Sequence, residues 1–160
     1  MVRPAVEADR WCIVEILVFA KRMAYRPIFQ DDFFSFRLLN VHDTAQEVDP
    51  SAALVWEEKG ILKGVLTFGL ARDQDCPGCC EVYGLYIDPC FQRERIGGRL
   101  MGEVLGKARN QPVVLWCLEP NRAALDFYRS QGFCPDGAHR LVEGTPVWEI
   151  RLRCPAPVPF

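Results

Sequence analysis

The chain has 160 residues, of which 49% are hydrophobic and 25% are charged, a composition that predicts a folded protein and excludes an intrinsically disordered one. Its 19 basic and 21 acidic side chains give a formal net charge of -2, so it lacks the excess of Lys and Arg that nucleic-acid binding requires. The apolar run at residues 11–20 contains Glu15 and is too short to span a bilayer. We expect a cytoplasmic protein that binds neither nucleic acid nor membrane, with a single domain at residues 1–154 and a proline-rich tail at 155–160.

The first third of the chain predicts one strand and two helices. A short strand fits residues 2–5, and apolar side chains then recur at helical spacing in a helix over about residues 8–24. We expect Arg26-Pro27 to end this helix, because proline disrupts helical hydrogen bonding. A second helical stretch is expected at residues 31–39, where two aspartates suit a helix N-terminus.

The rest of the chain alternates strand and helix patterns around short turns. In chain order the expected elements are hairpin strands at 53–57 and 61–71, a strand at 81–87, a helix at 95–109, a strand at 113–118, a helix from about 122 to 131 and a strand-like stretch through 147–153. Gly132 stands where the C-terminal cap of the last helix belongs. The order β-α-α-β-β-β-α-β-α-β predicts an α/β (α+β) fold with a mixed central β-sheet flanked by helices.

Eight cysteines are present, and no disulfide is implied for a cytoplasmic protein. Most stand alone and are expected to act as small hydrophobic residues, namely Cys12, Cys90, Cys117, Cys134 and Cys154. The exception is Cys76-Pro77-Gly78-Cys79-Cys80, which has the spacing of a metal knuckle. A four-ligand zinc site needs a second pair of ligands, and none is visible in the sequence. We therefore expect a Pro-Gly turn with incidental thiols and no bound metal, and keep zinc as the alternative.

A candidate anion site follows the strand at residues 81–87. After Asp88-Pro89 the chain enters a helix N-terminus, whose backbone N–H groups lack intrahelical partners and lie at the positive end of the helix dipole. Glycines there permit close approach of a diphosphate, and arginines supply charge-assisted donors. The residues assigned to this site are Gln92, Arg93, Glu94, Arg95, Ile96, Gly97, Gly98 and Arg99. The alternative is that the glycines serve only helix packing and the arginines form a solvated face.

Two motifs in this order resemble those of the GNAT superfamily of acetyl-CoA dependent N-acetyltransferases. Residues 92–97, Gln-Arg-Glu-Arg-Ile-Gly, are similar to the family's Q/R-x-x-G-x-G/A, and residues 121–133 are similar to its N-x-x-A-x-x-F-Y-x-x-x-G-F. The chain departs from the first motif at Arg95, which replaces a glycine. The Arg95 N–H can still donate to a phosphate if its φ is negative, and its guanidinium offers a further donor.

The resemblance implies that acetyl-CoA is the co-substrate and that it lies between the strands at 81–87 and 113–118. Main-chain groups of Leu85, Tyr86 and Ile87 would then pair with the pantetheine arm. The other implied coenzyme contacts are Asn121, which also fits a helix N-cap, Ala124, Phe127 and Tyr128. Gly84 fits a close backbone approach in this strand, or alternatively a small residue needed for packing.

The resemblance also implies two catalytic residues. Tyr128 is the candidate general acid for the leaving thiolate, with a core tyrosine as the alternative. Glu81 is the candidate base for the amine, although an exposed glutamate at a strand end is the commoner case and relatives also use water. Tyr25, Phe29, Phe33 and Phe34 correspond to a region that borders the acceptor site in relatives, and we expect most of them to pack in the core. His42 and His139 show no interpretable pattern.

The expected function is transfer of an acetyl group from acetyl-CoA to a primary amine by direct attack in a ternary complex. The alternatives are a non-catalytic coenzyme A-binding regulatory or scaffold protein of the same fold, and, less favoured, an interaction module stapled by zinc at residues 76–80. The acceptor remains open among polyamines, amino acids, antibiotics and protein amines. A homodimer is compatible with the resemblance.

Overall fold

The computed structural model describes residues 1–156. Its seven strands form a mixed sheet in the order β1-β2-β3-β4-β5-β7-β6. Contacts within the chain divide it into two compact units. The first unit comprises residues 1–67 and 84–101, and the second comprises residues 68–83 and the chain from 102 onward. No helix within residues 1–156 is both long and apolar enough to cross a membrane.

The first unit begins with strand β1 and the long helix α1. The bounds of its elements are β1 Val2–Pro4, α1 Arg10–Phe29, α2 Val41–Glu47 and β2 Ala53–Glu58, followed by β3 Ile61–Leu70, whose first seven residues belong to this unit. β2 pairs antiparallel with β1 and β3. Ile13, Ile16 and Leu17 of α1 are buried in one cluster with Val55 and Val65. The expected helical periodicity and the hairpin are thus confirmed.

Helix α1 continues through Pro27 to Phe29, so the expectation that Arg26-Pro27 ends it was wrong. Pro27 has no N–H to donate to the Met23 carbonyl, so α1 lacks one backbone hydrogen bond in its last turn. Beyond it, Gln30 adopts a left-handed conformation and donates its N–H to the Arg26 carbonyl, which caps the helix. The ring of Phe29 packs against Tyr25 and Phe34.

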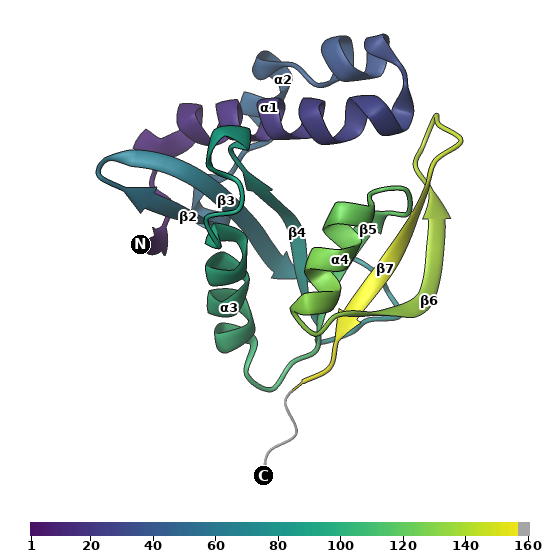
Figure 1. The fold of residues 1–160 in the computed structure, drawn as a ribbon. Coiled ribbons are helices and arrows are strands. Elements are labelled where there is room, and N and C mark those ends of the chain that lie inside the picture. Colours follow the sequence, from purple (N-terminus) through teal and green to yellow (C-terminus); the bar gives the residue numbers. More distant parts are fainter. Residues whose placement is uncertain (157–160) are drawn as a thin grey trace. The chain divides into compact units, whose positions relative to one another are not determined.

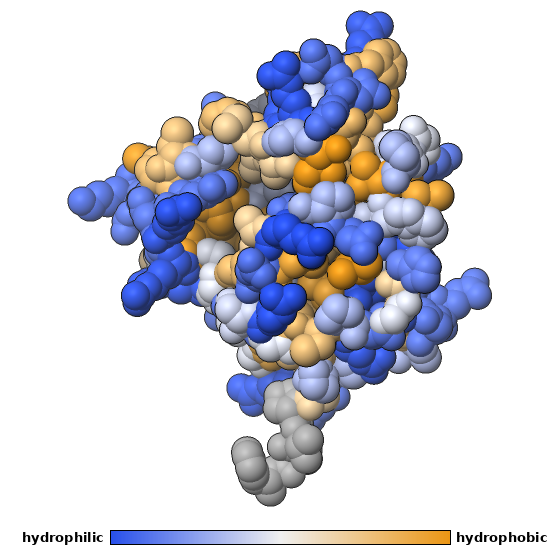
Figure 2. Space-filling view, turned by 45° about the vertical axis from the view of Figure 1, so that its right-hand side comes forward, coloured by the Kyte–Doolittle hydropathy of each residue, from blue (hydrophilic) through white to orange (hydrophobic). Residues whose placement is uncertain are grey.

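The expected helix at 31–39 is a single π-helical turn at Phe34–Leu38, and a separate helix, α2, follows it. Asn40 begins α2 by accepting the N–H of Asp43 on its side-chain oxygen, a standard N-cap that the sequence analysis missed. Figure 1 shows α2 lying alongside α1. Several apolar side chains of this helical region are exposed, among them Trp11 and Phe33, and Figure 2 shows hydrophobic patches between hydrophilic residues on the face it presents.

Like β3, β4 Cys80–Ile87 and α3 Ile96–Ala108 contribute residues to both units. The second unit adds β5 Val113–Leu118, α4 Arg122–Ser130, β6 Cys134–Leu141 and β7 Trp148–Cys154. In this unit Cys80–Val82 of β4 pair parallel with β5, and β7 pairs antiparallel with β5 and with β6. The expected elements from β4 to α4 are confirmed. The last segment, however, is a hairpin of two strands. Only β7 was expected from the sequence, and β6 was missed.

The second unit contains a buried arginine network. Arg151 is 5% exposed, and its guanidinium donates to Asp75 at 2.7 and 2.8 Å, to Asp136 at 2.7 Å and to Asp73 at 3.2 Å. The indole of Trp116 donates to the same Asp73 at 2.9 Å. The network therefore fastens the loop between β3 and β4 to β5, β6 and β7. In the tail, residues 155 and 156 have no regular structure, and the rest of the expected proline-rich tail lies outside the described residues.

Candidate acetyl-CoA site

The expected phosphate turn lies in the first unit and leads into α3. Asp88 accepts the N–H of Cys90 at 2.8 Å, which starts the short helical turn Pro89–Phe91. The residues 92–95 that follow are exposed, and the Arg99 N–H donates to the Arg95 carbonyl at 3.3 Å in the first turn of α3. The amides of residues 96–98 precede this bond and lack intrahelical acceptors. Together with the helix dipole they form a site able to hold an anion.

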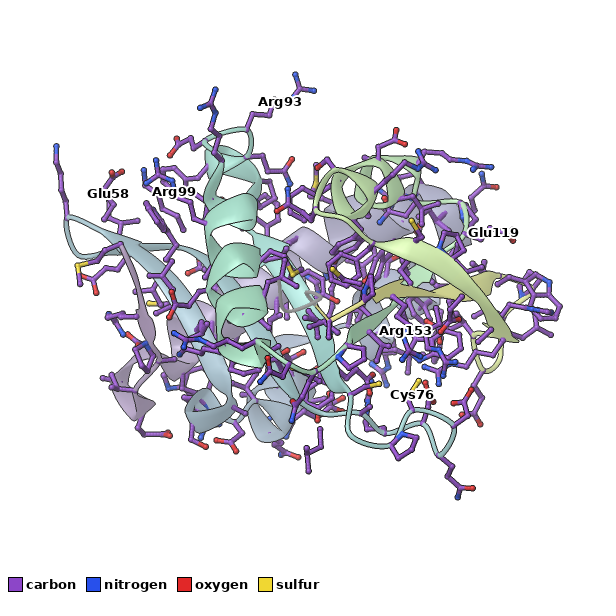
Figure 3. The ribbon with its side chains drawn as sticks, turned by 90° about the horizontal axis from the view of Figure 1, so that it is seen from below. Glu58, Cys76, Arg93, Arg99, Glu119 and Arg153 are labelled. Carbon is purple, nitrogen blue, oxygen red and sulfur yellow. The ribbon has the colours of Figure 1, made fainter. Side chains whose placement is uncertain are left out.

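Two arginines of this turn adopt left-handed backbone conformations. Arg93 has φ +67° and Arg95 has φ +62°, so the condition that φ of Arg95 is negative is not met. Arg95 instead takes the backbone region that glycine favours, at a conformational cost of about 1–2 kcal/mol. Figure 3 shows the side chain of Arg93 pointing away from the start of α3. The turn thus keeps a glycine-like path and adds exposed guanidinium groups.

A buried lysine that was not predicted from the sequence braces the turn. Lys63 of β3 is 8% exposed; its ammonium is ion-paired with Glu58 and lies 3.0 Å from the Glu94 carboxylate. These two carboxylates raise the pKa of Lys63. The Lys63 carbonyl also accepts the Asp88 N–H at 2.9 Å. An isolated lysine in a strand pattern gives no sign of burial, so only the fold reveals this brace.

Arg99, the last residue of the expected phosphate site, is turned toward β2. Its guanidinium lies 4.9 Å from the centre of the Trp56 ring, and Figure 3 shows it on the side of α3 that faces Glu58. Ile96 is 2% exposed and anchors the helix start in the core. Gly97 and Gly98 are half-buried. The exposed side chains of the site are therefore those of residues 92–95 and Arg99.

On β4, Leu85, Tyr86 and Ile87 are half-buried. The Tyr86 hydroxyl lies 3.0 Å from that of Tyr25 on α1, and its ring packs against the core of the first unit. A Cβ on Gly84 would lie 2.6 Å from Cε2 of Tyr86. Gly84 therefore makes room for the Tyr86 ring, which favours the packing alternative for this glycine.

Helix α4 of the second unit carries the other motif. The Asn121 side chain accepts the Ala124 N–H at 3.3 Å, which confirms the expected N-cap. At the other end Gly132 has φ +91° and the Phe133 N–H donates to the Tyr128 carbonyl at 3.1 Å, so the expected glycine cap is also confirmed. The Tyr128 ring is half-buried, with the Phe127 and Phe133 rings 5.3 and 6.0 Å away. Ala124 and Phe127 are likewise half-buried.

Glu81 is not exposed at the end of its strand, so the alternative of an exposed surface glutamate was wrong. Its side chain is 1% exposed, and both carboxylate oxygens accept hydrogen bonds from Arg72. The Arg72 guanidinium donates to Oε1 at 2.5 and 3.2 Å, and the Arg72 backbone N–H donates to Oε2 at 2.8 Å. The Arg72 side chain itself remains 63% exposed. A carboxylate held in this way must break an ion pair before it can accept a proton.

The cysteines divide into buried and exposed ones. Cys76 and Cys79 are buried in a small cluster with Val114. The Cys79 N–H donates to the Cys76 carbonyl at 3.2 Å and closes the turn. Figure 3 shows Cys76 in this loop. Burial raises the pKa of the Cys76 thiol, which disfavours the thiolate that binds metal. Cys117 is also buried and Cys154 is half-buried, but Cys12, Cys90 and Cys134 are exposed, contrary to expectation. Within residues 1–156 no three His, Cys, Asp or Glu side chains are placed to hold a metal ion.

Two curated proteins of Mycobacterium tuberculosis are similar to the chain over 74 residues each. N-alpha-acetyltransferase RimI is 43% identical, over 44% of this chain and 47% of its own length. "Probable N-acetyltransferase Rv2775" is 36% identical, over 46% of this chain and 41% of its own length. The matched segment thus spans less than half of either relative.

Among solved structures, the PaiA N-acetyltransferase of Thermoplasma acidophilum in complex with coenzyme A shares the fold. Its TM-score is 0.75 at 15% identity, and the match covers 97% of this chain and 98% of that chain. The sequence profile of the Acetyltransferase (GNAT) family matches residues 13–133, which contain both motifs. Since this match covers most of the sequence, the chain belongs to the Acetyltransferase (GNAT) family.

Proposed function

We propose that the chain is an N-acetyltransferase that transfers an acetyl group from acetyl-CoA to a primary amine. The observation that carries the proposal is the family match over residues 13–133, which includes both the phosphate turn and the α4 motif. The PaiA protein, which has the same fold, was solved with coenzyme A. RimI, the curated relative with 43% identity, is an N-alpha-acetyltransferase.

The first unit presents the groups proposed to hold the coenzyme. In the first unit, the N-terminal amides of α3 and the side chains of Gln92, Arg93 and Arg95 would bind the phosphates. Main-chain groups of residues 85–87 would pair with the pantetheine arm. The exposed turn and its brace by Lys63 support this assignment, because a preformed anion site loses less entropy on binding. Acetyl-CoA supplies the activated thioester.

Tyr128 is the residue proposed to act on the reacting atoms. Its hydroxyl would donate a proton to the departing thiolate, a contribution of about 10²–10⁴ in rate. The cap at Asn121 and the packing against Phe127 and Phe133 support the proposal, because they hold the ring in one place. For the amine proton, the ion pair between Glu81 and Arg72 favours water as the base over the Glu81 carboxylate.

The alternative is a coenzyme A-binding protein without turnover, and the replacement of the motif glycine by Arg95 is the observation that favours it. Two measurements on the same protein separate the readings. At a ligand concentration about 100 times its dissociation constant, acetyl-CoA should stabilise the fold by about 2.7 kcal/mol, and a panel of primary amines should then release free thiol. Stabilisation without thiol release by any amine would support the binding protein, and no stabilisation would overturn both readings.

The acceptor and the oligomeric state stay open, and the cellular location stays a prediction. A homodimer is compatible with the family resemblance, and size-exclusion chromatography with light scattering tests it. A cytoplasmic location is expected from the composition and tested by fractionation of cells that express the chain.

A further inference from the structure

We propose that the second unit contains a binding pocket for an alkylammonium ion, formed by Glu119, His139 and Trp148. The pocket has a volume of about 300 Å³, and Ile150 and Pro135 complete its wall. The binding of the cation does not depend on the proposed function. Only the further step, that this cation is the amine acceptor, rests on it.

A bulge in β6 shapes one side of the pocket. The register of β6 with β7 breaks between Pro135 and His139, and Gly137 within this stretch has φ +96°. Bulges of this kind redirect the side chain that follows them. Here the His139 ring lies 5.2 Å from the Trp148 ring at an angle of 53°, and its Nδ1 lies 3.3 Å from the Gly137 carbonyl. Two aromatic rings thus meet at one wall of the pocket.

Glu119 brings a carboxylate to the same place. Its backbone N–H donates to the Trp148 carbonyl at 2.9 Å, which fixes the end of β5 beside the start of β7, and Figure 3 shows Glu119 near these strands. Among residues 1–156 no cationic side chain pairs with the Glu119 carboxylate. The pocket therefore carries an exposed negative charge that the protein itself does not neutralise.

The cations nearest in the hairpin are already engaged elsewhere. Side chains alternate along a strand, so Trp148 and Ile150 share one face of β7 while Glu149 and Arg151 share the other. On that other face Arg140 pairs with Glu149 and lies 3.9 Å from the centre of the Trp116 ring. Arg151 is held by its three aspartates. Neither guanidinium is available to the pocket.

A carboxylate, an indole and an apolar floor are the groups that recognise an alkylammonium ion. The indole face attracts a cation through its quadrupole, the carboxylate adds a charge pair, and Ile150 and Pro135 can contact the methylene groups. The volume is at the lower end of the range for small-molecule sites. The pocket therefore fits a small aliphatic amine or one long cationic side chain of a protein, and it does not fit an anion or a large aromatic amine.

The binding test uses tetramethylammonium, a cation that cannot be acetylated, so its result is independent of catalysis. The chain has two histidines, and the ring signals of His139 and His42 can be followed together by NMR. We expect a saturable shift of the His139 signal with none at His42, which lies on α2. Glu119→Gln should weaken this binding by roughly two- to fivefold, and Trp148→Leu by a similar factor of roughly two to five. The control is Glu143→Gln, which removes the same charge from an exposed residue outside the pocket. It should leave the affinity for tetramethylammonium unchanged.

The two possible sources of the ion are distinguished kinetically, with 1,4-diaminobutane and a lysine-containing peptide as acceptors. For the preferred acceptor, Glu119→Gln should raise KM and leave both kcat and the acetyl-CoA dissociation constant unchanged. Equal shifts at His42 and His139, or binding that Glu119→Gln and Trp148→Leu leave intact, would overturn the pocket even if the chain acetylates amines. Conversely, specific tetramethylammonium binding without thiol release would preserve the pocket and refute the proposed function.

Discussion

The left-handed conformation of Arg95 can be separated from its charge by two substitutions. Arg95→Gly removes both the guanidinium and the Cβ that is unfavourable at φ +62°, whereas Arg95→Ala removes only the guanidinium. A non-glycine residue in this region is disfavoured by about 1 kcal/mol relative to glycine, even after the greater freedom of glycine in the unfolded chain is included. For a protein of this size 1 kcal/mol corresponds to about 2–4 °C in Tm. Arg95→Gly should therefore melt about 2–4 °C above Arg95→Ala.

The same two substitutions at Arg95 also test the coenzyme site. If the Arg95 guanidinium contacts a phosphate, both variants should bind acetyl-CoA roughly two- to tenfold more weakly than the unmodified chain and by equal factors, because the contact is solvent-exposed. Differential scanning calorimetry and isothermal titration calorimetry give the two quantities. The conformational argument would be refuted if Arg95→Gly melted at or below Arg95→Ala. Unchanged affinity in both variants would remove the guanidinium from the site.

Four further predictions concern the second unit. Glu81→Gln should lower the unfolding free energy by about 1–3 kcal/mol, because it weakens the hydrogen bonds between the buried Glu81 side chain and Arg72, but change kcat less than tenfold; a fall of about 10² or more in kcat would restore Glu81 as the base. Arg151→Met should lower stability by about 3–5 kcal/mol in chemical denaturation. The hydrogen-bonded Arg151 also lowers the pKa of Asp75. The stability that this pair contributes is therefore present above about pH 4 and lost as the pH falls further. An unfolding free energy that stays constant from about pH 5 to 3 would contradict this. Elemental analysis should find well under one zinc per chain, and stoichiometric zinc at Cys76 would overturn the turn interpretation.

The elements around the site could be predicted because local signals there agree with one another. Helix α4 has a capping asparagine, an amphipathic pattern and a terminal glycine, and the structure places its ends within a residue of the prediction. Strand β5 is a continuous apolar run whose bounds were predicted as they stand. Where propensity, capping and periodicity coincide, the tertiary structure has little to override.

The elements that were missed depend on contacts that no local pattern encodes. Helix α1 extends two residues beyond Pro27 to Phe29, and a sequence pattern cannot place a helix end to within two residues. Strand β6 is mostly exposed and contains a proline, a glycine and a bulge, so it resembles a loop until its pairing with β7 is known. Missing β6 also concealed the pocket, since the proximity of His139 and Trp148 depends on that hairpin.

Within the candidate site, residue types were easier to predict than their partners. The exposure of the turn at 92–95 and the cap at Asn121 follow from local sequence. The burial of Glu81 and Lys63 does not, because each is a buried charge paired with an exposed side chain of another segment, Arg72 and Glu94 respectively. Such pairs become visible only when the strands are brought together.

The most direct test of the account is the turnover of Tyr128→Phe. The substitution removes the hydroxyl and keeps the ring that packs against Phe127 and Phe133, and thermal denaturation establishes that the variant is folded. With an amine that the unmodified chain acetylates, thiol release at saturating acetyl-CoA should fall by about 10² or more, which is about 2.7 kcal/mol in the barrier. The acetyl-CoA dissociation constant should be unchanged. A folded variant that binds acetyl-CoA and turns over at the unmodified rate would contradict the claim that Tyr128 is the general acid.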